Sequence, residues 1–160
     1  MADTVSRFCG ILLLKEKKRR PYALLLPHFD GRRFKIPGGM QETGDVSPYD
    51  AMIREAMEEL EVRPQNVDLQ GEYPDTNNPL NLRTFWMAVE WEGQIRTERK
   101  LIENEWVEPP MWIEITSDLI NEHHPQVVYS HLMALKKGIV WGKAKLETFH
   151  YFAQNNRVAA

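Results

Sequence analysis

The stretch that decides the fold runs from Gly38 to Val62, GGMQETGDVSPYDAMIREAMEELEV, in which a glycine pair leads into an acidic helix. Ser47 followed by Pro48 predicts the helix start. A serine side chain can accept a hydrogen bond from the first free amides, and proline suits the first helical position. The helix should continue to about Leu60 and end before Pro64. The pattern therefore predicts a strand, a glycine turn and a capped helix in succession.

The faces of this helix separate two kinds of residue. At about 100° per residue, one apolar stripe should face the core, and three carboxylates fall together on roughly the opposite face. The stripe is Ile53, Met57 and Leu60, and the carboxylates are Glu55, Glu58 and Glu59. Carboxylates at this spacing repel one another and weaken an isolated helix. A divalent cation would reverse that penalty, because Mg²⁺ prefers carboxylate and water oxygens together with substrate phosphates.

Two neighbouring features favour a functional cluster over an ordinary solvated surface. Arg54 lies one turn before Glu58 and can hold a carboxylate in a fixed orientation. The Gly38-Gly39 turn lets the backbone come close to a metal ion or a phosphate. A glutamate pair alone is usually surface, but this pair comes with the arginine, the turn and the cap at fixed spacing.

The same stretch resembles the Nudix box, which is Gly, five residues, Glu, seven residues and then Arg-Glu-U-x-Glu-Glu-x-Gly-U, where U is a bulky aliphatic residue. The core here is REAMEELEV, residues 54–62, and Pro37-Gly38-Gly39 resembles the usual lead-in. The box glycine is replaced by Glu61, and one aliphatic position is only Ala56. Asp45 stands for the first box glutamate with one extra residue before Arg54, so the role of Asp45 stays open.

The resemblance implies an α/β (α+β) fold, a Nudix-type α/β/α sandwich with a mixed β-sheet, as a single domain over residues 1–160. It implies Mg²⁺ or Mn²⁺ bound by Glu55, Glu58, Glu59 and the Gly39 carbonyl, with Glu55 as a ligand or the group that activates water. Arg54 would orient the acidic cluster. The cation would neutralise a diphosphate and make water a better nucleophile.

The implied activity is metal-dependent hydrolysis of the diphosphate linkage in a nucleoside diphosphate derivative. The substrate stays open among nucleoside triphosphates, nucleotide sugars and dinucleotides. Arg33 and Lys35 precede the glycine turn and could meet phosphates, with a solvated strand edge as an equal alternative. Many relatives carry a further acid opposite the box helix, and Glu103 and Glu105 are the candidates here, with an ordinary surface loop almost as plausible.

Outside the box, the sequence predicts several strands and a few helices. This mixture indicates a layered α/β or α+β domain. The expected strands are residues 5–14, 22–27, 33–36, 67–73, 83–91, 106–107 and 112–115, with a charged hairpin tip at 15–20. The expected helices are residues 116–122, 126–137 and 143–154. Cys9, inside the first apolar strand, should be buried.

Composition excludes several classes of protein. The 160 residues are 42% hydrophobic and 27% charged, as in an ordinary globular chain. The net charge of −3 gives no support for nucleic-acid binding, and no apolar stretch is long enough to span a membrane. A single cysteine and a start without signal-peptide features indicate a cytoplasmic protein. We expect a small-molecule nucleotide as partner, no nucleic acid and no membrane, with a homodimer left open.

Two other functions are compatible with the resemblance. One is a Nudix-fold domain that senses a nucleotide without hydrolysing it. The Arg54-Glu55 and Glu58-Glu59 pairs argue against it, because a pure binder has no need of a repulsive acidic cluster. The other is an isomerase of the isopentenyl diphosphate type. Its best-known form uses a cysteine in the cavity, and Cys9 is poorly placed for that role.

Overall fold

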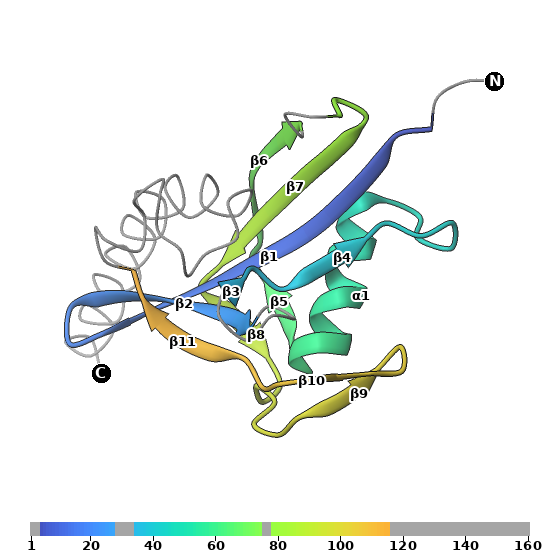
Figure 1. Ribbon diagram of the computed structural model, residues 1–160. Helices are drawn as coiled ribbons and strands as arrows, with labels where there is room; N and C mark the ends of the chain where they lie inside the picture. The colour runs from blue at the N-terminus through green and yellow to red at the C-terminus, as the bar shows by residue number, and fades with distance from the viewer. Residues whose placement is uncertain (1–3, 28–33, 75–77, 116–160) are drawn as a thin grey trace.

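The computed structural model describes residues 4–27, 34–74 and 78–115. Its centre is a mixed sheet with strand order β11–β2–β1–β7–β6, in which β3 also pairs with β2 and β4 with β1 (Figure 1). These strands are β1 Ser6–Lys17, β2 Arg20–Pro27, β3 Phe34–Lys35, β4 Gly38–Met40, β6 Asp68–Pro74, β7 Asn81–Ala88 and β11 Met111–Glu114. Because β1 runs parallel to β7 and antiparallel to β2, the expected mixed sheet is confirmed.

Two small sheets accompany the large one. They pair β5 Arg63–Gln65 with β8 Glu90–Glu92, and β9 Lys100–Ile102 with β10 Glu105–Val107. The expected strand at residues 83–91 is therefore wrong as one element, because β7 pairs with β1 and β6 whereas β8 pairs with β5. The short strands β4, β5 and β9 were not expected. The helices expected between residues 116 and 154 lie outside the described residues.

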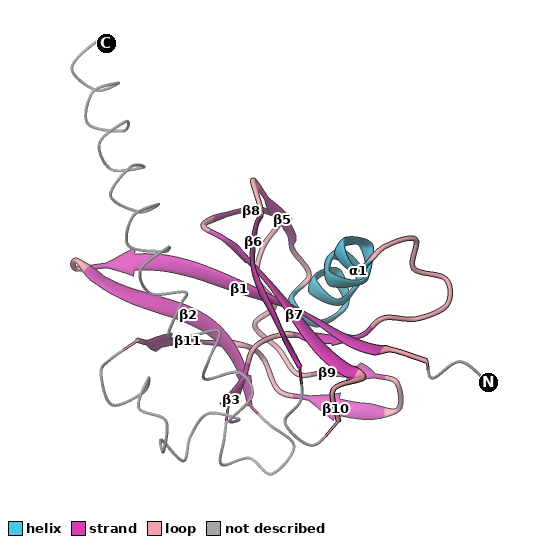
Figure 2. Cartoon of the chain, turned by 90° about the horizontal axis from the view of Figure 1, so that it is seen from above, coloured by secondary structure: helices cyan, strands magenta, loops and turns pink. Residues whose placement is uncertain are grey.

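Strand β1 is buried on both faces, because its side chains alternate between two apolar clusters. Cys9, Ile11 and Leu13 belong to the cluster that includes the helix α1, Pro48–Leu60. Leu12 and Leu14 belong to a second cluster on the other face of the sheet. Figure 2 shows α1 lying along one side of the strands. Because successive side chains of a strand point to opposite faces, one apolar run contributes to the clusters on both sides of the sheet.

The β1–β2 hairpin is tighter than the charged segment predicted. Lys17 pairs with Arg20, so the strands continue into the expected tip and leave Lys18 and Arg19 as the turn. Both turn residues have positive φ, 51° and 63°, the backbone twist that two-residue hairpin turns favour.

Helix α1 begins and ends where the sequence predicted, but its faces differ from the expectation. Met57 is 46% exposed, so its place in the buried stripe was wrong. The core contact is made by Met52, Ala56 and their neighbours Ile53 and Leu60. Glu55 and Glu59 are only 9% and 7% exposed, so they do not lie opposite the core. They lie against β4, where the Gly38 amide donates to the Glu59 carboxylate and Gly39 lies close to the Glu55 carboxylate.

The cap of α1 gives a first prediction. The Ser47 side chain accepts a hydrogen bond from the Asp50 amide at 3.1 Å, and Pro48 follows it at the first helical position. Ser47→Ala should therefore lower the free energy of unfolding by about 1 kcal/mol, the usual loss of such a cap. Urea denaturation measures this, with Ser47→Asp as a variant that keeps a capping oxygen. An unchanged midpoint in Ser47→Ala would contradict the assignment.

Candidate active site

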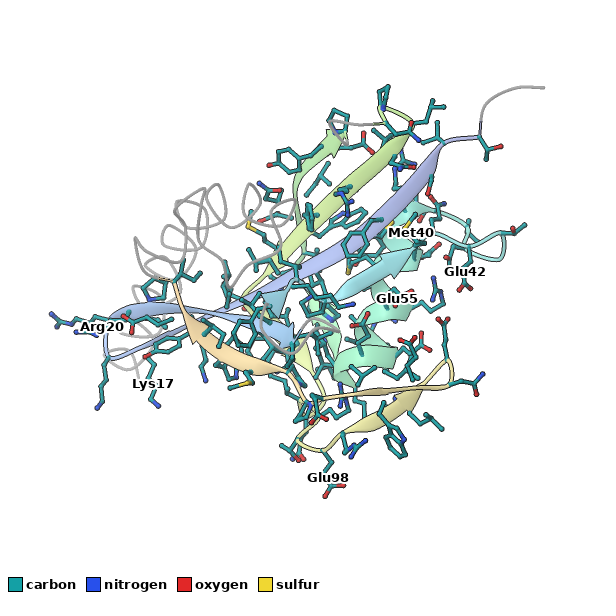
Figure 3. The ribbon with its side chains drawn as sticks, viewed as in Figure 1. Lys17, Arg20, Met40, Glu42, Glu55 and Glu98 are labelled. Carbon is teal, nitrogen blue, oxygen red and sulfur yellow. The ribbon has the colours of Figure 1, made fainter. Side chains whose placement is uncertain are left out.

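A cavity of about 410 Å³ lies between α1, the glycine strand β4 and the β9–β10 hairpin. It is lined by Lys35, Gly38, Gly39, Met40, Glu42, Glu55, Glu58, Glu59, Ile102, Glu103, Glu105 and Val107. Figure 3 shows Glu55 and Glu42 at the side of α1 and β4, with the yellow β9–β10 hairpin below them. The cavity therefore brings together the three helix carboxylates, Gly39, Lys35 and Glu105. Arg33 lies outside the described residues.

Arg54 organises the acidic side of this cavity. Its Nε and Nη2 donate to the two Asp45 carboxylate oxygens, both at 3.0 Å. Its Nη1 donates to Glu55 Oε1 at 2.8 Å and lies 3.7 Å from Glu58 Oε2. Its Nη2 also donates to the Met40 carbonyl at 3.2 Å. The guanidinium thus joins the loop, β4 and two helix carboxylates.

Asp45 is the fixed partner of this arginine. Besides the two bonds from Arg54, it accepts one from the Glu42 amide at 2.8 Å. These hydrogen bonds, first of all the one from Arg54, hold the pKa of Asp45 below its usual range. The extra loop residue therefore still allows Asp45 to contact Arg54.

Glu55 and Glu59 are buried side by side at the base of the cavity. Burial is the main cause that raises the pKa of both carboxyls, to about 8 for Glu59, and Arg54 beside Glu55 and Lys35 beside Glu59 act in the opposite direction. The Gly38 amide donates to Glu59 Oε1 at 3.3 Å. Glu59 Oε2 is buried and has no hydrogen-bond partner. A buried oxygen without a partner is costly, so this site favours a ligand that can contact it.

The donor set fits a hard divalent cation, although the ligands are not already gathered. Within residues 4–27, 34–74 and 78–115, no three Asp, Glu, His or Cys side chains converge on one point as metal ligands do. The unpartnered Glu59 Oε2 and the half-buried Glu58 are nevertheless oxygens of the kind that Mg²⁺ prefers. A cation here would offset the repulsion between two buried carboxylates.

The two glycines lie in strand β4 rather than in the expected turn, and they have different neighbours. A Cβ on Gly38 would lie 2.3 Å from the Cys9 carbonyl oxygen, which belongs to the backbone of β1. A Cβ on Gly39 would lie 2.3 Å from Glu55 Oε1. The first glycine is therefore required by strand packing, whereas a side chain at the second would displace the Glu55 carboxylate from β4.

The opposite wall of the cavity is the β9–β10 hairpin. Its turn residues Glu103 and Asn104 both have positive φ, 50° and 66°, and Glu105 begins β10. Both Glu103 and Glu105 line the cavity, so the acids expected opposite the helix do face it across the space. Lys35 lines it from β3.

The end of α1 depends on two basic residues that the sequence did not single out. The last turn contains no basic side chain and carries Glu58 and Glu59, which is unfavourable beside the negative end of a helix. Lys100 Nζ donates to the Glu58 carbonyl at 2.9 Å, and Arg96 Nε donates to the Glu59 carbonyl at 2.9 Å. The Arg96 amide also donates to the Leu60 carbonyl at 3.0 Å. Distant residues thus satisfy the free carbonyls of the helix.

The raised pKa of Glu59 gives a prediction for stability. Its folded-state pKa of about 8 exceeds the ordinary value of about 4.3, so the native state binds more protons between these values. Stability without divalent cations should therefore fall as pH rises through this window. Glu59→Gln should remove part of that slope. Melting temperatures from pH 5 to 9 in chelator measure it; equal slopes in both proteins would contradict the prediction.

The site combines a mixed sheet, a capped acidic helix and a glycine strand at one cavity, and similarity to known proteins gives the family. The chain belongs to the Nudix family: the model described as NUDIX domain matches residues 5–128. It is 35% identical over 66 residues to the 8-oxo-dGTP diphosphatase of Escherichia coli (strain K12). That alignment covers 39% of this chain and 48% of the relative, so the chain matches about half of that protein.

Solved structures support the same fold. A NUDIX hydrolase from Nitrosomonas europaea has a TM-score of 0.64 at 18% identity, over 86% of this chain and 90% of that one. The MutT NUDIX hydrolase from Burkholderia pseudomallei has a TM-score of 0.58 at 18% identity, over 82% and 95%. The NUDIX domain of Shewanella oneidensis NrtR, solved with ADP ribose, has a TM-score of 0.62 at 16% identity, over 86% and 87%. In the part of this chain that is described, no helix has the length and apolar character to cross a membrane.

Proposed function

We propose that this Nudix domain hydrolyses the diphosphate linkage of a nucleoside diphosphate derivative with the help of Mg²⁺ or Mn²⁺. The observation that carries the proposal is the pair of buried carboxylates, Glu55 and Glu59, at the base of the cavity, one with an oxygen that lacks a partner. Such a pair is unfavourable on its own and becomes useful beside a cation. Family membership supports the same chemistry, because Nudix domains are typically diphosphatases.

The residues of this chain have separable roles in the proposal. Glu55, Glu58 and Glu59, with the Gly39 carbonyl, would hold the cation. When bound, it supplies the positive charge that neutralises a diphosphate and lowers the pKa of water. Arg54 orients Glu55 through the 2.8 Å hydrogen bond and is itself held by Asp45.

The substrate would enter between Lys35 and the hairpin wall. The Lys35 ammonium can contact a phosphate oxygen, and the proposal extends this task to Arg33. Glu105 faces the helix carboxylates across the cavity, where a carboxylate can bind a further cation or accept a proton from water. The domain would span residues 1–160. The single cysteine of the chain, the buried Cys9, supports a cytoplasmic protein.

A substrate screen tests this function. The native chain is incubated with nucleoside triphosphates, nucleotide sugars and dinucleotides in Mg²⁺ or Mn²⁺, and the products are separated by chromatography. 8-oxo-dGTP and ADP-ribose come first, because a relative and a solved neighbour carry those names. Hydrolysis of one compound supports the proposal. Tight nucleotide binding without any product would favour the alternative, a nucleotide sensor.

The metal site has its own prediction. Mg²⁺ or Mn²⁺ should raise the melting temperature of the native chain, because a cation that binds only the folded state stabilises it by mass action. Glu58→Gln plus Glu59→Gln should reduce this response. The control is Glu92→Gln plus Glu98→Gln, at two exposed positions outside the cavity lining. This variant removes the same charge and should keep the native rise in melting temperature. Equal responses in all three proteins would rule out α1 as the metal site.

A further inference from the structure

Arg96 is a buried cation held by main-chain oxygens. The residue is 6% exposed, and its guanidinium donates to the carbonyls of Glu59, Glu98, Val107 and Glu108. Burial is the main cause that lowers its pKa, and nearby glutamates act in the opposite direction. We call this side chain with its four carbonyl partners the Arg96 clamp.

The clamp joins the two walls of the cavity. One partner, Glu59, belongs to the last turn of α1, and its own carboxylate lines the cavity. Another, Val107, belongs to β10, and its side chain lines the cavity from the other side. Lys100, at the start of β9, adds a second link through the Glu58 carbonyl. These two side chains thus connect the end of α1 to the hairpin that carries Glu105, beside the main-chain bond from the Arg96 amide to the Leu60 carbonyl.

Only arginine suits the central position. Its planar group offers five donors in a fixed arrangement, whereas lysine offers three donors from one point. A lysine here would leave at least one of the four carbonyls without a donor. An unpaired buried carbonyl is costly, so the wall that loses its donor is expected to move towards water.

We propose that Arg96 is a positioning residue, which fixes the spacing between the helix carboxylates and the hairpin that faces them. This role rests on the proposed function, since it concerns the geometry in which a diphosphate and its cation would be held. Arg96 does not line the cavity and acts through the backbones of Glu59 and Val107. A misplacement of reacting groups by only about 1 Å can cost about 10²-fold in turnover, so a small change in this spacing should be measurable.

The spacing itself can be measured without any substrate. Nitroxide labels are placed at Asp50→Cys, on the exposed start of α1, and at Leu101→Cys, which is 52% exposed on β9. Neither position lines the cavity, and the native Cys9 is buried. Electron double resonance should give one narrow distance for the native clamp and a broader or shifted distribution for Arg96→Lys. Arg96→Met should broaden it further if it folds.

Kinetics and Mn²⁺ affinity show whether the spacing matters. Arg96→Lys should lower kcat by about 10- to 100-fold with a smaller change in KM, and weaken Mn²⁺ binding followed by water proton relaxation. Leu14→Ala is the control, since it destabilises the core cluster on the other face of the sheet and should keep the native kcat. Each variant is assayed where circular dichroism shows it to be folded.

The outcomes separate the inference from the proposed function. An unchanged label distance in Arg96→Lys overturns the clamp. A broadened distance with native kcat and native Mn²⁺ affinity also overturns it, because Arg96 would then only stabilise the fold. If the native chain hydrolyses nothing, the proposed function fails, while the label distances and Mn²⁺ affinity still decide the positioning role.

Discussion

Glu59→Gln should reduce turnover of the best substrate by at least about 10²-fold, the low end for loss of an acid–base or electrostatic group. The substitution keeps the size of the side chain and an oxygen for the Gly38 amide, which donates to Glu59 Oε1. It removes the charge from the carboxylate whose other oxygen is buried and unpartnered. Steady-state kinetics in Mg²⁺ and in Mn²⁺ measure the effect.

Stability and binding controls make this result specific. Since burial disfavours the charged form of Glu59, the glutamine variant should melt no lower than the native chain in metal-free buffer above pH 8. Nucleotide binding should partly survive, because Lys35 and the hairpin wall are unchanged. Near-native turnover in Glu59→Gln would remove this residue from the reaction. Turnover that falls in step with melting temperature would indicate a structural role.

Gly38→Ala should cause the largest loss of stability, about 3 kcal/mol, the upper end of the usual cost, because the added methyl group overpacks a rigid site. Its Cβ would lie 2.3 Å from the Cys9 carbonyl oxygen and 2.6 Å from the Gly10 Cα. Both atoms belong to β1, which is hydrogen-bonded to β4 on one side and β7 on the other, so the strand has no room to move away. For a chain of this size the melting temperature should fall by roughly 6–12 °C.

A second glycine in the same segment provides the control. At Gly44 an added Cβ has no atom within 4 Å, so Gly44→Ala should melt close to the native temperature. Thermal denaturation of both variants in chelator separates strand packing from any effect on metal binding. Similar melting temperatures for Gly38→Ala and the native chain would show that β4 can shift away from β1.

The local features of the fold could be predicted from the sequence because they depend on neighbouring residues. The cap at Ser47, the helix end near Leu60 and the buried first strand follow from turn chemistry and apolar pattern within a few positions. The acidic cluster, Lys35 and Glu105 were candidates before the structure, which brings them to one cavity. Their roles in binding and catalysis stay predictions.

The sequence predictions were wrong where contacts between distant segments determine which side chains are buried. Met57 was placed in the core because it is apolar at the right period, but the sheet contacts the line through Met52 and Ala56. Glu55 and Glu59 are buried because β4 passes over them, which no helix period shows. The burial of Arg96 could not be predicted, because a single arginine in a polar stretch has the same sequence pattern whether it is solvated or bound by four carbonyls.

The dependence of α1 on Arg96 and Lys100 also has a consequence for the order in which the chain folds. A helix whose last turn is acidic and lacks a local basic partner is marginal when isolated. Arg96, which donates to the Glu59 carbonyl, lies 37 positions after it, and Lys100 lies 42 positions after Glu58. The parallel β1–β7 pairing joins residues as distant as Ser6 and Asn81. Closing such long loops is slow, so we expect the end of the helix to be secured late in folding. A nascent chain that stops short of Arg96 would hold the whole acidic motif in its sequence and still lack the rigid platform that the motif needs.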